Sequence, residues 1–251
     1  MKSVIWSLVA LLLLACQHSS LPLKSHSIQS QGYRLWQLSD LKETHVLHIY
    51  LEGDGQPWLG NGVIALDPGP RGLVSLPLMK QDLSARLYLG RPCYFQSYVK
   101  AQNCHPSLWT RARYSQQVVD VMVNALLAQT NLDAYDEWVL IGHSGGGALA
   151  YLMAQQLPKV NKVIAISSNL DVSAWVAHHQ YAPLDQSLDP AKIDSPKPLA
   201  LFYLAGGKDK NVPLELNQTF LNKVNAKIIL REEYDHNCCW EKEWQKILDQ
   251  I

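Results

Sequence analysis

The sequence has 251 residues, of which 47% are hydrophobic and 18% are charged, and its 22 basic and 22 acidic residues balance. This length suits one sizeable core, because α/β domains often reach it undivided. The charge balance gives no support for nucleic-acid binding, which usually leaves a basic patch. We therefore expect one folded domain and no nucleic-acid partner.

The start of the chain has the pattern of a secretory signal. Lys2 provides a positive charge, residues 4–14 form an apolar run, and Ala15 precedes Cys16. Such a run is too short to span a bilayer but suits the core of a signal peptide. The segment resembles the bacterial lipobox, whose cysteine is acylated and becomes the mature N-terminus. We predict a signal peptide over residues 1–15 and a membrane anchor on Cys16. An ordinary signal peptide with an incidental cysteine is the alternative.

The segment after Cys16 is polar and serine-rich, which predicts a tether. Its fifteen residues, 17–31, reach roughly 50 Å when extended. We place the lipidated cysteine and the tether in residues 16–32 and the folded domain in residues 33–251. Gln17, rather than aspartate, follows the cysteine, and in enteric-type sorting this favours the outer membrane. The expected location is the bacterial cell envelope, facing the periplasm.

An exported chain makes the other four cysteines candidates for disulfides, and four cysteines allow three connectivities. Cys93 and Cys104 close a short loop and are the preferred pair. Cys238 and Cys239 are adjacent. A trans peptide holds their Cα atoms about 3.8 Å apart, so a bridge between them would be strained. Crossed bridges between the two pairs stay open.

Short apolar segments alternate with helical patterns along the rest of the chain. The strand-like segments are residues 33–38, 46–51, 86–89, 138–141, 162–166, 199–204 and 227–230. One helical pattern follows Arg111, and another runs from Trp240 to Ile251. This alternation predicts a mostly parallel sheet with helices on both faces. Ligands of such sheets bind at the carboxyl ends of the strands.

The segment GHSGG at residues 142–146 fits G-x-S-x-G, the nucleophile elbow. It follows a strand-like segment and opens a helical pattern that ends at Pro158. Glycines two positions before and after the serine avoid clashes in so tight a turn. We therefore predict that Ser144 stands exposed at a helix N-terminus, where backbone N–H groups favour developing negative charge.

Two other interpretations of these glycines stay open. Gly145, Gly147 and Ala150 also fit G-x-G-x-x-A, the dinucleotide fingerprint, with Asp171 downstream as a ribose ligand. However, this motif follows the fourth recognisable strand rather than an opening βαβ unit, and an exported protein would meet little NAD. In the other interpretation the glycines serve packing alone and Ser144 is chemically idle.

A serine hydroxyl needs a base to take its proton, and the base needs an acid to orient it. In hydrolases with this elbow the chain order is Ser, then Asp or Glu, then His. Ser144, Asp209 and His236 follow this order, each just after a predicted strand. Asp171 is the alternative acid, because some hydrolases carry theirs after the preceding strand. Asp235 is too close to His236 in sequence to orient it.

The transition state also needs two hydrogen-bond donors for its oxyanion. One is expected to be the backbone N–H of Gly145, directly after the nucleophile. The other is expected from the loop after residues 46–51, which reads EGDG at residues 52–55. The N–H of Asp54 is the preferred donor and that of Gly55 the next. The alternative is that EGDG is only a turn.

From about residue 33 onward the chain resembles the α/β-hydrolase superfamily and, more closely, a group of bacterial exported hydrolase-like proteins. The matching segments are LEGDG, LYLGRPCYF with a later cysteine, GHSGGGALA, SSNLD followed by tryptophan, LAGGKDKNVP and DHNCCW.

The resemblance implies an α/β-hydrolase fold with a short lid segment between Asp171 and Pro198. It also implies a serine hydrolase of carboxylesterase type that acts on a small-molecule or lipid-like acyl ester and requires no metal or cofactor. Amide or peptide cleavage uses the same groups. A catalytically silent envelope lipoprotein with a binding role is the alternative from another class. The sequence does not indicate the oligomeric state.

Overall fold

The computed structural model describes residues 23–100, 103–194 and 196–251. Within them one sheet is formed by β1 (Lys24–Ser30), β2 (Tyr33–Asp40), β3 (Val46–Leu51), β4 (Ala85–Leu89), β5 (Glu137–His143), β6 (Val160–Ile166), β7 (Ala200–Gly206) and β8 (Lys227–Arg231). The α-helices are α1 (Ser75–Gln81), α2 (Gln116–Leu127), α3 (Gly145–Ala154), α4 (Val172–His178), α5 (Gln218–Lys223) and α6 (Trp244–Leu248).

The strand order is β1-β2-β4-β3-β5-β6-β7-β8. From β4 to β8 all neighbours pair in parallel, whereas β1–β2 and β2–β4 are antiparallel. Each of the seven predicted strands is present, most of them longer by one to three residues. The prediction of a mostly parallel α/β sheet is confirmed.

Strand β1 corrects the predicted extent of the tether. The predicted tether includes residues 24–30, but these residues pair with β2 over their whole length, from Lys24 opposite Ser39 to Ser30 opposite Tyr33. The sequence of β1 is polar because the strand lies at the edge of the sheet and most of its side chains are exposed. An edge strand gains its stability from backbone pairing and needs little apolar patterning. The predicted signal peptide and Cys16 lie outside the described residues.

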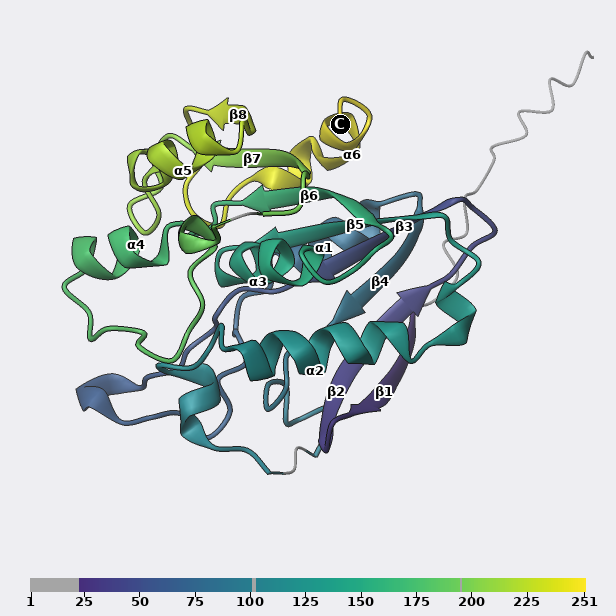
Figure 1. Cartoon of the computed structure of the whole chain (residues 1–251), viewed down its shortest axis with the longest axis horizontal. Helices are drawn as coiled ribbons and strands as arrows, with labels where there is room; N and C mark the ends of the chain where they lie inside the picture. The colour runs from purple at the N-terminus through teal and green to yellow at the C-terminus, as the bar shows by residue number, and fades with distance from the viewer. Residues whose placement is uncertain (1–22, 101–102, 195) are drawn as a thin grey trace, which may run out of the picture.

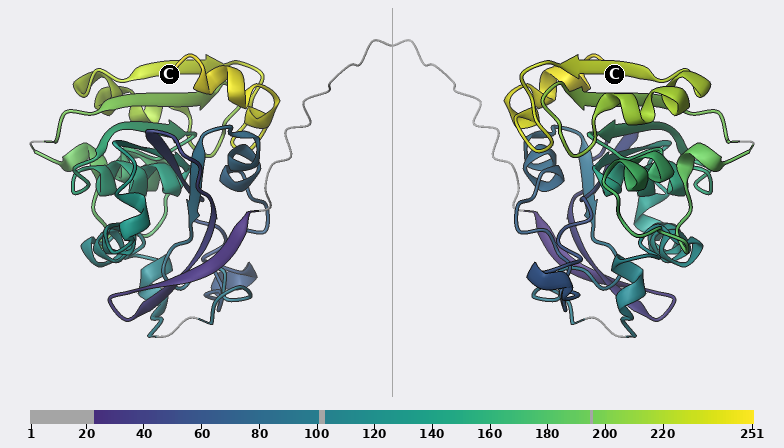
Figure 2. Two further views of the ribbon diagram at one scale, coloured as in Figure 1. Left: turned by 90° about the vertical axis from the view of Figure 1, so that its right-hand side faces the viewer. Right: turned by 90° about the vertical axis from the view of Figure 1, so that its left-hand side faces the viewer.

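Helices cover both faces of the sheet (Figure 1). Helices α2 and α3 contact each other on one face, and α1 contacts α6 on the other. Figure 2 shows the sheet between these two groups. All ten residues of α3 are buried, which follows from its uniformly apolar sequence GGGALAYLMA. Helix α3 lies against β5 and β6 at the centre of the sheet, so the residue that opens it is held by the most buried part of the core.

The C-terminal helix α6, Trp244–Leu248, is shorter than the predicted range from Trp240 to Ile251. A 3₁₀ turn occupies Trp240–Lys242 and α6 begins only at Trp244. Both tryptophans are fully buried, as expected for core residues, and Trp244 donates a hydrogen bond of 3.0 Å to the hydroxyl of Tyr50. No helix in the described part of the chain is long and apolar enough to cross a membrane.

The structure joins Cys93 to Cys104 in a disulfide, the pairing that the sequence favoured, with Cα atoms 5.6 Å apart. It also joins the adjacent Cys238 and Cys239, the pairing that the sequence left open. The first bridge fixes the segment that follows β4, and the second begins two residues after His236. Both bridges therefore belong to loops rather than to strands or helices of the sheet.

Candidate active site

Ser144 lies on a sharp turn between β5 and α3, at the carboxyl end of the central strands. Its φ of 51° and ψ of −127° are strained for a residue with a side chain. A Cβ at Gly142 would run into the main chain of Gly146, so only glycine fits two positions before the serine. The local geometry is therefore that of the predicted nucleophile elbow.

The structure brings Ser144, His236 and Asp209 together in one hydrogen-bonded chain. His236 Nε2 lies 3.1 Å from Ser144 Oγ, and His236 Nδ1 lies 2.9 Å from Asp209 Oδ2. His236 follows β8, and Asp209 follows β7. The three residues come from different loops at the same edge of the sheet, which is where parallel strands present their carboxyl ends.

The charge on Asp209 sets the tautomer of the histidine. Burial alone would raise the pKa of this carboxyl, but hydrogen bonds from His236 and from the Val212 main chain outweigh it and lower the pKa. Asp209 Oδ1 accepts N–H groups from Asn211 at 2.9 Å and Val212 at 2.8 Å, which leaves Oδ2 for the histidine. An ionised carboxylate at Nδ1 requires the proton on Nδ1. Nε2 therefore presents its lone pair to Ser144.

Asp171, the alternative acid, has a different role in the structure. Its carboxylate accepts the N–H of Ala174 at 2.8 Å and so caps the N-terminus of α4. Among the described residues, the carboxylate that contacts the His236 ring is that of Asp209. The geometry therefore favours Asp209 over Asp171.

The loop after β3 is held by a cluster of buried charges that no motif in the sequence indicates. Asp54 Oδ1 accepts a hydrogen bond from Arg91 Nη1 at 2.8 Å, and Asp54 Oδ2 accepts one from Arg113 Nη1 at 3.0 Å. The Tyr114 hydroxyl donates to the same Oδ2 at 2.5 Å. The two guanidinium groups lie far from Asp54 in sequence, so the sequence carried no signal for this cluster.

The same loop, which carries Asp54, packs against the turn that carries Ser144. A Cβ at Gly145 would clash with the Asp54 carboxylate, so the carboxylate packs directly on the residue after Ser144. Gly55 has a φ of +66°, and a Cβ there would collide with the main chain of Pro68 and Pro70. The residues of the predicted oxyanion hole, Asp54, Gly55 and Gly145, are thus neighbours in the structure.

Glu52, the first residue after β3, has a buried side chain. Its carboxylate accepts N–H groups from Val74 and Ser75 at 3.1 Å, at the start of α1. Burial raises the pKa of this carboxyl, and these N–H groups oppose the rise. Glu52 therefore fixes the loop to the start of α1.

His143, between Gly142 and Ser144, contacts the loop that carries His236. Its Nε2 donates a hydrogen bond of 2.8 Å to the main-chain carbonyl of His236. Burial, with a further contribution from the nearby His236, lowers the pKa of His143 to about 3. The ring is therefore neutral at ordinary pH and holds the histidine loop by a hydrogen bond rather than by charge.

This buried neutral histidine predicts acid sensitivity of the fold. An unfolded histidine takes up a proton near pH 6.5, whereas folded His143 does so only near 3. The unfolded state therefore binds more protons in this window, and the folded state loses stability as the pH falls from about 6.5 towards 3. We expect His143→Gln to remove up to about 1.4 kcal/mol per pH unit of this loss.

Urea unfolding of both proteins at pH 7, 5.5 and 4.5 measures the effect. His45→Gln is the matched control, because the His45 side chain is 91% exposed. Parallel stability curves for the wild type and His143→Gln would contradict the assignment.

Ser144 and His236 open into a cavity of about 1510 Å³ at the carboxyl edge of the sheet. Its walls include the loop after β3, Trp58 and, from the lid segment, Trp175 and Tyr181. Trp58 and Tyr181 are about half exposed, at 49% and 52%. The site thus combines a polar floor with aromatic walls, as small-molecule sites commonly do.

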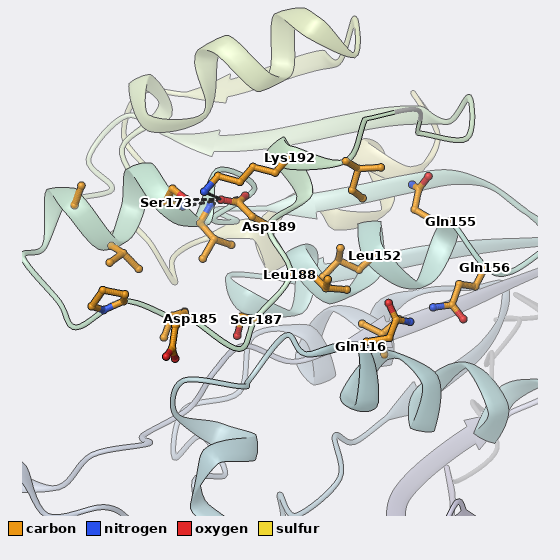
Figure 3. Close-up of a pocket in the computed structure, with 17 residues that line it drawn as sticks. Gln116, Leu152, Gln155, Gln156, Ser173, Asp185, Ser187, Leu188, Asp189 and Lys192 are labelled. Carbon is orange, nitrogen blue, oxygen red and sulfur yellow. Dashed lines mark hydrogen bonds and ion pairs between the residues drawn. The ribbon is translucent and has the colours of Figure 1, made fainter.

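A second cavity of about 780 Å³ lies behind the lid segment (Figure 3). We call residues 181–189 the strap. Three strap residues, Pro183, Leu184 and Asp185, line both cavities. Figure 3 shows Asp185 and Ser187 on the strap, across this cavity from the side chains of α2 and α3. The strap therefore separates the two cavities.

Among the described residues, no group of three or more His, Cys, Asp or Glu side chains is placed to hold a metal ion.

Comparison with solved structures finds proteins that share the fold of this chain. An esterase from Pyrococcus furiosus superposes with a TM-score of 0.66 at 11% identity, over 92% of this chain and 91% of that one. Est1E from Butyrivibrio proteoclasticus, determined with ferulic acid bound, gives 0.58 at 14% identity, over 90% and 98%. An acylaminoacyl peptidase from Pyrococcus horikoshii gives 0.62 at 11% identity, over 93% of this chain but 41% of the peptidase.

No protein-family model matches the sequence, and no curated protein sequence matches it. Identities of 11 to 14% establish shared architecture and leave activity to be argued from the site. The sheet order, the elbow after β5 and these superpositions agree, and the chain has the α/β-hydrolase fold.

Proposed function

We propose that the protein is a serine hydrolase that cleaves an ester or related acyl bond. The observation that carries the proposal is the chain of hydrogen bonds from Ser144 through His236 to Asp209, at the floor of an open cavity. A nucleophile, a base and an orienting acid in this geometry are the groups that acyl transfer requires. Esterases and a peptidase among the structures with this fold support a hydrolytic reaction.

In the proposed reaction Ser144 Oγ attacks the acyl carbon while His236 Nε2 takes its proton. Asp209 holds the Nδ1 proton in place and stabilises the imidazolium. The N–H groups of Gly145 and Asp54, with Gly55 next to them, stabilise the oxyanion. His236 then gives its proton to the leaving oxygen. Water, deprotonated by the same nitrogen, releases the acid from Ser144.

The charged groups of the site favour this function over the dinucleotide interpretation. The G-x-G-x-x-A pattern would bring a pyrophosphate against Gly145, but the Asp54 carboxylate already occupies that surface. A Cβ at Gly147 would meet the Ser168 hydroxyl, so this glycine serves packing between α3 and the residues after β6. A silent scaffold is the remaining alternative, and the intact hydrogen-bonded chain favours catalysis over it.

We also propose attachment to the envelope through Cys16, on the lipobox resemblance. Strand β1 runs in the same direction as the parallel strands, so Lys24 lies at the end of the sheet opposite the cavity. The eight residues 16–23 that precede Lys24 would reach roughly 27 Å when extended. An anchored domain would therefore hold its cavity away from the lipid surface, open to substrates of the periplasm.

Fluorophosphonate labelling of the purified domain tests the proposed function. The labelled peptide, identified by mass spectrometry, should contain Ser144, and the Ser144→Ala variant should take up no label. The wild type should hydrolyse p-nitrophenyl esters, tested over a graded series of chain lengths, and the Ser144→Ala variant should not. A folded domain that neither labels nor hydrolyses these esters would point to the binding role instead.

A further inference from the structure

Asn211 occupies the position beside the reactive nitrogen of the proposed base. Its side-chain amide nitrogen lies 3.0 Å from His236 Nε2, and Ser144 Oγ lies 3.1 Å from the same atom. The proton on Nδ1 leaves Nε2 with a single lone pair. Ser144 and Asn211 therefore both donate towards one acceptor, and the serine needs that acceptor for its own proton.

The lone pair of His236 Nε2 can accept a hydrogen bond from Ser144 or from the Asn211 amide, but not fully from both. We therefore expect the Asn211 amide to have another hydrogen-bond partner during the reaction. The leaving oxygen and the attacking water must each come within about 3 Å of Nε2. An oxygen in that position is also within reach of the Asn211 amide. Water accepts the amide N–H and donates to Nε2 at the same time, so the amide and the base together define one water site.

Both the N–H and the carbonyl of Asn211 are hydrogen-bonded, and these bonds hold its side chain in position. Its N–H donates to Asp209 Oδ1 at 2.9 Å. Its carbonyl accepts two hydrogen bonds from the lid segment, at 3.1 Å from Trp175 Nε1 and at 2.7 Å from His179 Nε2. Asn211 is thus the residue where the acid loop meets α4.

The two donors, Trp175 on α4 and His179 directly after it, belong to an aromatic cluster that faces the substrate cavity. The His179 ring stacks on Tyr181 with centroids 4.9 Å apart, and Trp175 lies edge-on to both rings. Trp175 and Tyr181 line the cavity that holds Ser144. A substrate in contact with this wall would touch Trp175 directly and His179 through Tyr181, and Trp175 and His179 are the side chains that hold the Asn211 carbonyl.

We propose that Asn211 is a positioning residue that α4 holds in place and that orients the deacylating water against His236 Nε2. In this step the water gives one proton to Nε2 as its oxygen attacks the acyl carbon on Ser144. The tetrahedral intermediate then expels Ser144 Oγ, which takes the proton back from Nε2. The inference rests on the proposed hydrolase function and adds the residue that governs its second half-reaction.

The test separates acylation from deacylation in Asn211→Ala. Fluorophosphonate labelling needs Ser144 and His236 but no water, so its rate should stay within about threefold of the wild type. Steady-state turnover of p-nitrophenyl acetate should fall about tenfold, the worth of one hydrogen bond lost in the transition state. A pre-steady-state burst of p-nitrophenol should appear as the acyl-enzyme accumulates.

Two matched pairs complete the design. Lys210→Ala changes an exposed residue of the same loop and should leave both rates unchanged. His179→Phe keeps a ring against Tyr181 but removes the donor to Asn211, so turnover should fall in the same direction by about threefold, within the range of one weakened hydrogen bond. His178→Phe is its control.

Equal losses of labelling and turnover in Asn211→Ala would show a merely structural role and overturn the proposal. Unchanged or faster turnover would also overturn it. Failure of the hydrolase proposal itself is distinguishable, because the wild type would then take up no label.

Discussion

Asp209→Asn should lower kcat about 10⁴-fold while leaving the fold intact. The asparagine amide is nearly isosteric with the carboxylate but offers an N–H to His236 Nδ1. The histidine would then place its proton on Nε2, where it cannot accept the proton of Ser144. The single hydrogen bond of 2.9 Å between Asp209 Oδ2 and His236 Nδ1 thus decides the tautomer of His236.

The matched control is Asp171→Asn. Asp171 is the alternative acid and follows β6, as Asp209 follows β7. Asparagine caps a helix as well as aspartate does, so α4 should keep its N-terminal hydrogen bond to Ala174. We expect kcat within about twofold of the wild type, as for a substitution that spares the cap and the catalytic groups. Steady-state kinetics of both variants, with circular dichroism to check folding, measure the difference. A greater loss in Asp171→Asn would make Asp171 the acid.

Asp54→Ala should destabilise the fold by about 3–5 kcal/mol, because it leaves two buried guanidinium groups without their carboxylate. The side chains of Arg91 and Arg113 are only 3% and 9% exposed. Burial acts to raise the pKa of Asp54, but the two arginines outweigh it and lower the pKa. The charge of Asp54 therefore stabilises the fold above about pH 3.9, and this contribution is lost as the pH falls through the lowered pKa.

Urea unfolding at pH 7 measures the effect of Asp54→Ala. Asp185→Ala is the matched control, since Asp185 also pairs with an arginine, Arg111, at 3.9 Å but both side chains are more than half exposed. Exposed pairs contribute about 0–1 kcal/mol, so the control should lose no more than that. Similar losses in the two variants would mean that the Asp54 cluster is not held by its charges.

The fraction of Asp54→Ala that does fold should also have a low kcat. The carboxylate packs on Gly145 and fixes the loop whose N–H groups are proposed to bind the oxyanion. Loss of one such donor costs roughly 10²–10³-fold in kcat. Fluorophosphonate labelling should slow by a similar factor, because it passes through a similar oxyanion.

The strands and the chemistry-bearing residues could be predicted from local signals. Apolar segments of four to six residues are visible without any knowledge of their neighbours, and all seven proved to be strands. Ser144, Asp209 and His236 were identified by chain order and by their place after strands. These features depend on steric and hydrogen-bonding rules that act within a few residues, so a single sequence contains them.

Polar segments and paired charges could not be predicted in this way. Strand β1 lacks an apolar pattern because its partner, rather than its own side chains, stabilises it. The partners of Asp54 are 37 and 59 residues away, and Asn211 meets Trp175 across 36 residues. Only the packing of the sheet decides which of the many arginines and amides in the sequence approach a given carboxylate or ring.

The sequence by itself determined the class of fold, the elbow and the three residues of the proposed triad, because glycine sterics and strand patterns are local. The tertiary structure placed the carboxylate of Asp209 against His236 Nδ1 and that of Asp171 at the N-terminus of α4. It also placed Arg91 and Arg113 on Asp54 and Asn211 beside His236 Nε2. The reason is physical: a hydrogen bond depends on tenths of an ångström between groups from different loops, and these distances exist only once the sheet has brought the loops together.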